Sequence, residues 1–384
     1  MRYDALVIGA GPAGSVAARL LAQAGWHVAL AEKMEFPRRK VCGEFISAAT
    51  MPVLEACGVA DAFAIHAGPP VLRVGIYAGE ATLMAPEERG WGRALGREHL
   101  DLLLRDAAVA AGARLFQPVE MTSLRRKKSG GFACVLDGRE IAARTVIAAC
   151  GSWNAKGPFA LASKPAPSDL FAFKAHFSAG RLPPNLMALL AFPGGYGGLV
   201  QSDGGRTSLS CCIRRDALDK VRAHYPGRAA EAVLAHIVTS TRGAHEALDG
   251  ASLEGSFLST GPIHPGIRTL HKNGVFFTGN IAGEAHPIIA EGISMAIQAS
   301  GLLARLLING LSEDYALMWR LRFAPRIAAA SLFAHLAMND TARAAALGLL
   351  RAAPGLVSLG ARLSGKSASM PFGDGRLTGP SLPG

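Results

Sequence analysis

The sequence predicts an α/β protein, in which a parallel sheet with glycine-turned helices is accompanied by a second sheet and followed by C-terminal helices. Three observations predict this fold class. Residues 3–33 show the pattern of a strand, a glycine turn, a helix and a second strand, and residues 274–293 show another buried strand and glycine turn. Residues 155–265 contain several short alternating stretches that are typical of a sheet.

The first glycine turn is a G-x-G-x-x-G motif, formed by Gly9, Ala10, Gly11, Pro12, Ala13 and Gly14. Gly9 permits the sharp turn, Gly11 leaves room for a pyrophosphate, and Gly14 lets the helix pack close to the strand. Glu32 ends the second strand, where a carboxylate can accept hydrogen bonds from ribose hydroxyls. This context predicts an adenine dinucleotide at the helix N-terminus. The alternative is a glycine-rich turn without a ligand.

Length and composition exclude several classes of protein. The 384 residues can hold two domains. The sequence contains no run of 18 uncharged apolar residues, so we expect no transmembrane helix. The first strand begins near residue 4, which leaves no room for a signal peptide. The six cysteines lack C-x-x-C spacing and paired histidines, so we expect reduced thiols, a cytoplasmic location and no metal site.

The net charge of +11 allows two interpretations. Basic residues cluster at positions 38–40, 125–128, 214–215 and 320–326. They form either a solvated, arginine-rich surface or a surface that attracts polyanions such as NADPH, an acidic carrier protein or anionic lipid at a membrane. We do not expect nucleic acid as a partner, because aromatic residues are few and are not interleaved with these clusters.

The second glycine turn resembles the flavin motif G-D-A-A-G-x-x-x-P-x-x-G-E-G-I of the geranylgeranyl reductase and aromatic hydroxylase superfamily. The matching residues are Gly279, Ala282, Gly283, Pro287, Glu291, Gly292 and Ile293, whereas Asn280, Ile281 and Ala290 depart from the motif. Asn280 can still accept a hydrogen bond from a ribitol hydroxyl. The resemblance covers residues 1 to 330 and implies non-covalently bound FAD.

The same resemblance implies a Rossmann-type FAD-binding domain like that of p-hydroxybenzoate hydroxylase, interleaved with an antiparallel substrate domain. The expected boundaries are 1–70, 90–154 and 266–310 for the FAD-binding domain, 71–89 and 155–265 for the substrate domain, 311–363 for a C-terminal helical region, and 364–384 for a tail. Pro325 is expected to kink or end the helix that follows Ser312.

Three further segments resemble parts of this superfamily that surround the flavin. Residues 40–44 resemble its K-x-C-G-G segment beside the flavin ring, with Glu44 in place of the second glycine. Arg97 and Asp101 match its R-x-x-x-D pair, in which the arginine reaches the flavin phosphates; we interpret Asp101 as an ordinary helix residue. Gly151 ends the counterpart of the hydroxylase A-D-G segment. The implied cofactor-binding residues are Gly9, Gly11, Pro12, Ala13, Gly14, Glu32, Lys33, Lys40, Cys42, Gly43, Arg97, Gly151, Gly279, Asn280, Pro287, Gly292 and Ile293.

The flavin allows several reactions. The monooxygenase interpretation, in which a flavin hydroperoxide transfers oxygen, is favoured because the C-G-G segment and the aromatic cavity motif of the reductases are both altered. Reduction of an alkene, as in geranylgeranyl reductases, is the alternative, and a non-catalytic flavin-binding protein is a remote one. A halogenase is discounted, because the four tryptophans form no W-x-W-x-I-P motif. Since the chain has one dinucleotide fingerprint, NADPH or NADH is expected to dock transiently as electron donor; the alternative is that another donor reduces the flavin.

Apolar residues predict the substrate class. Leu190, Phe192 and Tyr196 lie where the reductases carry an aromatic cavity motif, and they predict a hydrophobic small molecule, free or tethered to an acidic carrier. The alternative is that Leu190 and Phe192 are plain core residues. His286 is the candidate acid or base, because its ordinary pKa lies near neutrality. Glu44 is the candidate residue to orient the substrate or hydrogen-bond the flavin. The alternatives are that His286 caps the following helix and that Glu44 accepts from backbone N–H groups.

Overall fold

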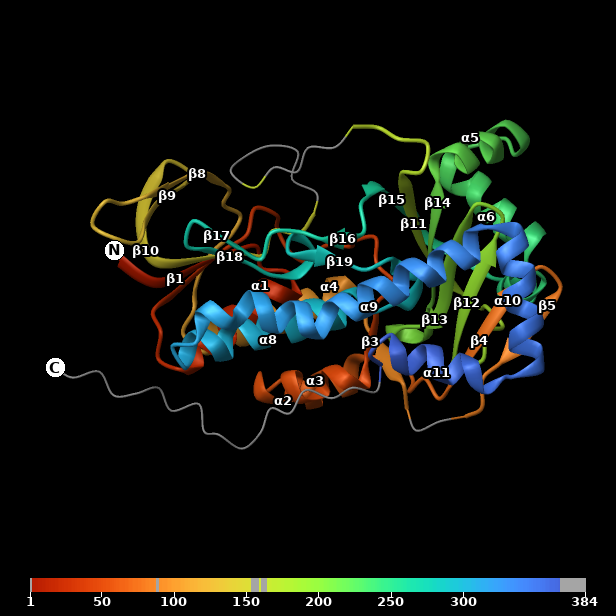
Figure 1. Cartoon of the computed structure of the whole chain (residues 1–384), viewed down its shortest axis with the longest axis horizontal. Helices are drawn as coiled ribbons and strands as arrows, with labels where there is room; N and C mark the ends of the chain where they lie inside the picture. Colours follow the sequence, from red (N-terminus) through yellow and green to blue (C-terminus); the bar gives the residue numbers. More distant parts are fainter. Residues whose placement is uncertain (1, 88–89, 153–158, 160–163, 367–384) are drawn as a thin grey trace.

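The computed structural model describes residues 2–87, 90–152, 159 and 164–366. Two sheets lie at opposite ends of the molecule, and long helices run alongside both of them (Figure 1). The predicted tail lies outside the described residues from position 367 onward, and so does Trp153, one of the four tryptophans.

The first sheet is mostly parallel and carries the first glycine turn. Its main path runs β17 (His271–Lys272), β18 (Val275–Phe277), β10 (Arg139–Ala148), β1 (Arg2–Ile8), β2 (Val28–Ala31) and β7 (Arg114–Phe116), and the antiparallel strands β8 (Met121–Arg126) and β9 (Phe132–Leu136) extend from β10. Side chains alternate between the two faces of β1. Ala5 and Val7 pack against the core with helices α1 (Pro12–Gln23), α4 (Arg97–Ala110) and α8 (Gly292–Ile308), whereas Leu6 and Ile8 pack against the β8–β9 hairpin.

The second sheet is antiparallel apart from the β4–β12 pair. Its order is β15 (Ser252–Ile263), β11 (Leu170–Ser178), β14 (Thr207–Arg214), β13 (Gly195–Gln201), β12 (Leu186–Phe192), β4 (Arg73–Ala78) and β5 (Ala81–Met84). Helices α5 (Arg215–His224), α6 (Ala229–Ser240) and α7 (Arg242–Leu248) contribute to the core on one face of this sheet. The other face borders the cavity described below.

Smaller elements connect the two sheets. They are α2 (Met51–Ala56), α3 (Ala60–His66), the pair β3 (Phe45–Ser47) and β6 (Gly92–Ala94), and the pair β16 (Gly266–Ile267) and β19 (Gly283–Glu284). The chain then continues into α9 (Tyr315–Met338), α10 (Asp340–Ala352) and α11 (Gly355–Leu363), which cross in front of the sheets in Figure 1. Among the described residues, no single helix is long and apolar enough to cross a membrane.

One local prediction needs correction. Pro325 neither ends nor interrupts α9, which continues to Met338. Proline deprives the carbonyl of Leu321 of its donor. Because Pro325 and Leu321 are both exposed, water can satisfy that carbonyl and the helix can continue.

Candidate active site

A cavity of about 580 Å³ runs between the two sheets. At one end it is bordered by the glycine turn after β1 and by the end of β2, and at the other by β12, β13 and the turn after β19. The position at the carboxyl ends of parallel strands is where α/β proteins bind dinucleotides. One continuous space therefore joins a nucleotide-type site to the second sheet.

The three glycines of the turn are needed for different reasons. Gly9 has φ +100°, and a Cβ there would lie 2.6 Å from the carbonyl oxygen of Ala149. A Cβ on Gly14 would lie 1.8 Å from the carbonyl oxygen of Gly9, so no side chain fits at this position. A Cβ on Gly11 would meet nothing closer than 3.7 Å, where the Arg97 guanidinium lies. Gly11 therefore faces open cavity, as a pyrophosphate-binding glycine requires.

Pro12 and Ala13 start helix α1, whose N-terminus borders the cavity. The positive end of the helix dipole and unpaired N–H groups at that end favour an anion. This end of the cavity fits the diphosphate of a dinucleotide.

Glu32 lies at the end of β2, at the wall of the cavity and almost fully buried. Its carboxylate accepts hydrogen bonds at 2.9 Å from the backbone N–H groups of Ala10 and Met34, and it also accepts two from Arg38. The bond to Ala10 fixes the glycine turn. Lys33 lines the cavity beside Glu32. These hydrogen bonds fix the position of the Glu32 carboxylate. Its contact with a ribose stays a prediction.

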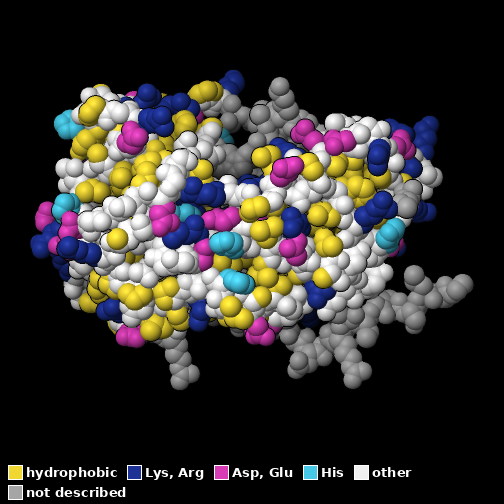
Figure 2. Space-filling view, turned by 180° about the vertical axis from the view of Figure 1, so that it is seen from behind, with side chains coloured by type: hydrophobic (Ala, Val, Ile, Leu, Met, Phe, Trp, Pro, Cys, Tyr) yellow, Lys and Arg dark blue, Asp and Glu magenta, His cyan; other side chains and the backbone are white. Residues whose placement is uncertain are grey.

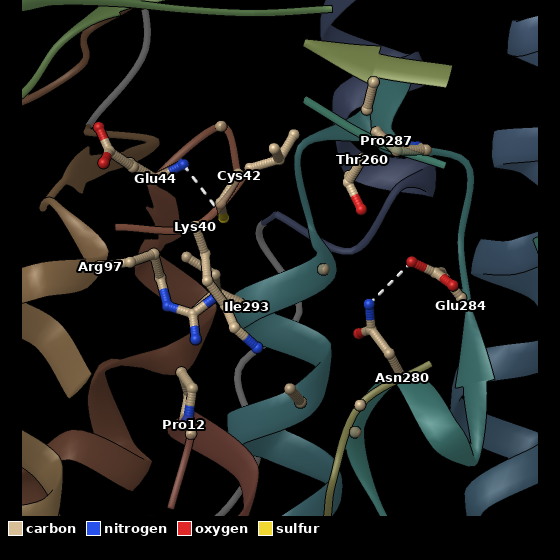
Figure 3. A pocket seen from close by; sticks show the side chains of 18 of the residues that line it. Pro12, Lys40, Cys42, Glu44, Arg97, Thr260, Asn280, Glu284, Pro287 and Ile293 are labelled. Carbon is tan, nitrogen blue, oxygen red and sulfur yellow. Dashed lines mark hydrogen bonds between the residues drawn. The ribbon is translucent and has the colours of Figure 1, made fainter. Parts of the chain in front are cut away.

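Two cations lie close together on one wall of the cavity. Figure 3 shows the side chains of Lys40 and Arg97 extending next to each other from different segments. Desolvation, followed by repulsion from Arg97 and Arg38, lowers the pKa of Lys40 to about 8. Such a site is short of negative charge, which a bound diphosphate would supply.

The segment beside the expected flavin ring contains Cys42, Gly43 and Glu44, all of which border the cavity. The Cys42 sulfur accepts a hydrogen bond at 3.4 Å from the backbone N–H of Glu44. A Cβ on Gly43 would lie 3.2 Å from Oγ of Ser210, so the segment packs closely against the second sheet. Glu44 has φ +62°, a left-handed conformation that the glycine of the resembled motif would adopt at lower cost.

Glu44 points away from Lys40 and Cys42 in Figure 3. Its carboxylate is fully buried, forms an ion pair with Lys174, and lies 2.8 Å from Nε2 of His176; both partners are buried on β11. Burial alone would raise the pKa of Glu44, but the hydrogen bond with His176 and the charge of Lys174 outweigh it and hold that pKa well below its usual range. This geometry indicates that Glu44 is a fixed charge that connects residues 42–44 to the second sheet. It does not favour a role for Glu44 in proton transfer.

The second glycine turn forms the opposite wall. Figure 3 shows Asn280 facing Glu284, and its Nδ2 donates to Oε1 at 2.8 Å. Gly279 has φ +70°, and a Cβ there would lie 2.9 Å from Cβ of Ala13 on the first turn. Contact between the two turns explains why both positions are glycine or alanine. Further predicted residues also border the cavity, namely Gly151, Pro287, Gly292 and Ile293.

The far end of the cavity is largely apolar, and here the sequence prediction was partly wrong. Met187 and Leu189 of β12 line the cavity, whereas Leu190 and Phe192 lie on the opposite face and pack into the core with the helices behind the sheet. Successive side chains of a strand point to opposite faces, so one residue of offset exchanges the two sets. Tyr196 lines the cavity, and its contact with a substrate stays a prediction.

The hydroxyl of Tyr196 lies 3.1 Å from Nδ1 of His286. Tyr196 borders the cavity, whereas His286 lies behind it and is not part of the wall. Burial lowers the pKa of His286 to about 4 and raises that of Tyr196 well above its ordinary value. The pair therefore consists of a neutral imidazole and a protonated phenol. His286 precedes a short 3-10 helix, but its side chain makes no capping bond.

Sequence reasoning missed several residues of this site. Arg38, Lys174 and His176 organise Glu32 and Glu44, and Asp101 is not an ordinary helix residue, because it is buried and bonded to Arg97. The match to the R-x-x-x-D pair was the one available signal for Asp101. The others depend on contacts between distant segments.

The open space at Gly11, the N-terminus of α1 and the cations Lys40 and Arg97 fit a flavin dinucleotide. The cavity continues to an apolar end suited to a second reactant. The site thus defines a flavin-dependent oxidoreductase. The sequence matches the FAD binding domain family over residues 2–316, and the chain belongs to this family. This confirms the predicted FAD and the predicted fold class.

Two curated relatives are reductases. Menaquinone reductase of Mycobacterium tuberculosis is 31% identical over 158 residues, which are 40% of this chain and 39% of that protein. The match thus spans about two fifths of that relative. Digeranylgeranylglycerophospholipid reductase 2 of Methanopyrus kandleri is 26% identical over 341 residues, 82% of this chain and 79% of that protein.

Two solved structures with a similar fold are described as flavin enzymes of other kinds than these reductases. The chondrochloren halogenase CndH of a myxobacterium gives a TM-score of 0.76 at 20% identity, covering 98% of this chain and 94% of that one. PqsL of Pseudomonas aeruginosa, described as a probable FAD-dependent monooxygenase, gives 0.73 at 16% identity, covering 91% and 100%. At these identities the likeness concerns the fold alone.

Proposed function

We propose that this chain is an FAD-dependent monooxygenase that hydroxylates a hydrophobic small molecule, with NADPH or NADH as electron donor. The observation that supports the proposal is the continuous cavity, which joins the dinucleotide-type site at Gly11 to an apolar end that contains Tyr196. In this reaction the donor supplies two electrons, one oxygen atom of O₂ enters the substrate, and the other leaves as water. Bound FAD, held without a covalent bond, would supply the redox chemistry.

The chain's own residues would bind and orient the reactants. The helix N-terminus with Lys40 and Arg97 would hold the diphosphate, and Met187 and Leu189 would exclude water from the substrate end. A hydroxylated aromatic substrate reacts with electrophilic oxygen more readily after losing a proton. The Tyr196 hydroxyl would hydrogen-bond the substrate oxygen and so favour loss of that proton, and His286, whose imidazole is neutral because its pKa is about 4, would accept a hydrogen bond from Tyr196 at 3.1 Å.

A second candidate is reduction of an alkene. The match of the digeranylgeranylglycerophospholipid reductase over 82% of this chain favours it, as does the menaquinone reductase match. The same Tyr196 hydroxyl would then donate a proton to the substrate carbon next to the one that receives hydride. Tethering of the substrate to an acidic carrier protein stays a prediction in both cases.

The decisive experiment separates the two half-reactions. Holoenzyme is reduced by NADPH or NADH without oxygen and then mixed with a panel of alkylphenols, alkylquinols and polyprenyl alkenes, with and without ¹⁸O₂. A product containing one ¹⁸O atom supports the monooxygenase. An anaerobic product that gains two hydrogen atoms, with no oxygen dependence, supports the reductase and overturns the first proposal.

The flavin itself is tested by acid precipitation. FAD released into solution supports non-covalent binding, and colour retained in the pellet contradicts it. A chain that binds FAD but is reduced by neither nicotinamide nor an artificial donor would be the non-catalytic alternative.

A further inference from the structure

The C-terminal helices expose an unusual amount of apolar surface. Of the fourteen large hydrophobic side chains that are exposed in the described part of the chain, eight lie between residues 311 and 363. Seven of these belong to α9, α10 and α11 and are 44–66% exposed: Leu317, Met318, Leu321, Leu332, Leu349, Leu359 and Leu363. Single exposed leucines are ordinary, but such a concentration on consecutive helices indicates an interaction surface.

Helix α9 is apolar on two sides. Its inner side buries Trp319, Phe323 and Ile327 in the core, as expected for a helix that covers a domain. Leu321 and Leu332 follow Leu317 at intervals that return to one side of the helix, and this side is exposed. A surface helix of a soluble domain normally carries polar residues there. The outer side of α9 therefore offers an apolar stripe to something beyond the chain's own core.

The charges around these leucines are mostly positive. From residue 315 to residue 366 the sequence contains seven Arg or Lys residues, of which Arg326 and Lys366 are buried, and a single acidic residue, Asp340. Arg320, Arg351 and Arg362 are exposed on the same three helices as the leucines. Figure 2 shows the opposite face of the molecule, where acidic and basic side chains are interspersed. Leucines flanked by basic residues are the composition of helices that lie on anionic membranes.

The inner sides of the same helices form part of the enclosure around the substrate end of the cavity. Val357 and Leu350 pack in one cluster with Met187 and Leu189, which line the cavity. Ala334 of α9 packs in one cluster with Tyr196. The exposed leucines thus lie on the outside of helices whose inside contacts the apolar cavity wall.

We propose that the outer surface of α9, α10 and α11 docks on an anionic phospholipid bilayer, so that the cavity takes its apolar substrate from the membrane. The second half of this statement rests on the proposed function, and the first does not. The helices lie in the interface instead of spanning it: α10 and α11 are together long and apolar enough, but they are bent by 116° at the break between them.

The test measures docking without turnover. Full-length holoprotein is sedimented with vesicles of phosphatidylcholine alone and of equal parts phosphatidylcholine and phosphatidylglycerol. We expect binding to the anionic vesicles that weakens between about 0.1 M and 1 M salt, because salt screens exposed charges. The triple variant Leu321→Ser, Leu349→Ser, Leu359→Ser should bind about tenfold more weakly or worse, because its apolar contacts are lost.

A matched control carries the same change elsewhere. Ile65→Ser and Leu253→Ser remove exposed apolar side chains from α3 and β15 and should leave vesicle binding unchanged. FAD content and circular dichroism confirm that each variant is folded. Failure of wild type to sediment with anionic vesicles overturns the proposal, as does equal binding by the triple variant. A wild-type dimer that the triple variant dissolves, without lipid binding, would assign the surface to self-association instead. Vesicle binding by a protein that hydroxylates nothing would overturn only the proposed function.

Discussion

Arg97 and Asp101, one helical turn apart on α4, are joined by two hydrogen bonds of 2.7 and 2.9 Å from the guanidinium to the two carboxylate oxygens. Asp101 is buried, and Nε of Arg38 lies 3.6 Å from the same carboxylate. Although burial opposes it, the charge of Asp101 raises the pKa of Arg97. Asp101 thus orients the Arg97 guanidinium at the phosphate end of the cavity, and Arg38, which donates its hydrogen bonds to Glu32, lies beside the same carboxylate.

Asp101→Asn should weaken FAD binding by about 1–3 kcal/mol, because a hydrogen bond between charged groups is lost and Arg97 is free to turn. The measurement is the FAD dissociation constant of the deflavinated protein, followed by flavin fluorescence. Asp106→Asn is the control, since Asp106 is an exposed residue of the same helix that pairs with Arg105. Equal FAD affinity in the two variants would show that Asp101 has no part in the site.

Lys40 should make the affinity for FAD depend on pH. Its pKa is about 8 without a bound anion, and a nearby diphosphate should raise it. Above pH 8, FAD binding therefore takes up a proton, and the affinity should fall as pH rises, by at most about tenfold per pH unit. Titration from neutral pH to pH 10 measures this slope. Lys40→Met should flatten it, whereas the exposed Lys128→Met should not. A slope that survives in Lys40→Met would assign the titration to another group.

Gly11 and Gly14 should respond differently to valine. A Cβ at Gly11 enters open cavity, so Gly11→Val should change the unfolding free energy of the FAD-free protein by only about 0.5 kcal/mol. It should nevertheless weaken FAD binding at least about a hundredfold, or roughly 3 kcal/mol. Gly14→Val would place Cβ against the Gly9 carbonyl, and we expect little folded protein. Normal FAD occupancy in Gly11→Val would refute the assignment of the turn.

Glu44→Gln should destabilise the fold by about 3–5 kcal/mol, because Lys174 is left as an uncompensated buried charge. Urea unfolding measures the loss. The double variant with Lys174→Met should recover part of it, since neither charge then remains. Because the pKa of Glu44 is lowered from 4.5, its contribution is present above pH 4.5 and is lost as pH falls below it. That acid-dependent part should be missing in Glu44→Gln; full additivity of the two variants would argue against the ion pair.

Tyr196→Phe should leave FAD content and the rate of flavin reduction unchanged but lower product formation by about 10²–10⁴-fold, the range for a lost acid or base. His286→Gln keeps a hydrogen-bonding side chain behind Tyr196 and should cost less. Stopped-flow reduction and product analysis separate the two steps. Full product formation in Tyr196→Phe would mean that the hydroxyl only fills space. Equal losses in both variants, with a changed pH profile, would show that the pair works as a unit.

The parts of the site that sequence predicted are those defined by local spacing. The glycine turn, Glu32 at the end of its strand and the second turn up to Ile293 are each encoded within about one supersecondary unit. The ties across the site are not local. Glu44 meets Lys174 and His176 from β11, and Tyr196 meets His286 across 90 positions. No periodicity in one segment reveals a partner on another.

The face of β12 was unpredictable for a different reason. The strand reads Leu-Met-Ala-Leu-Leu-Ala-Phe, apolar at every position, because one face meets the core and the other meets the apolar cavity. Alternation between apolar and polar residues normally shows which side of a strand is buried. With both sides buried, the pattern cannot distinguish Leu189 at the cavity from Leu190 in the core.

That two-faced strand has an evolutionary consequence. Substitutions at Met187 or Leu189 reshape the space offered to a substrate while the packing behind the sheet stays intact. Substitutions at Leu190 or Phe192 act on folding while the offered space stays nearly the same. Selection for a new substrate and selection for a stable fold can therefore act on alternate residues of the same strand. A lineage can therefore change its substrate here while the packing behind the sheet stays unchanged.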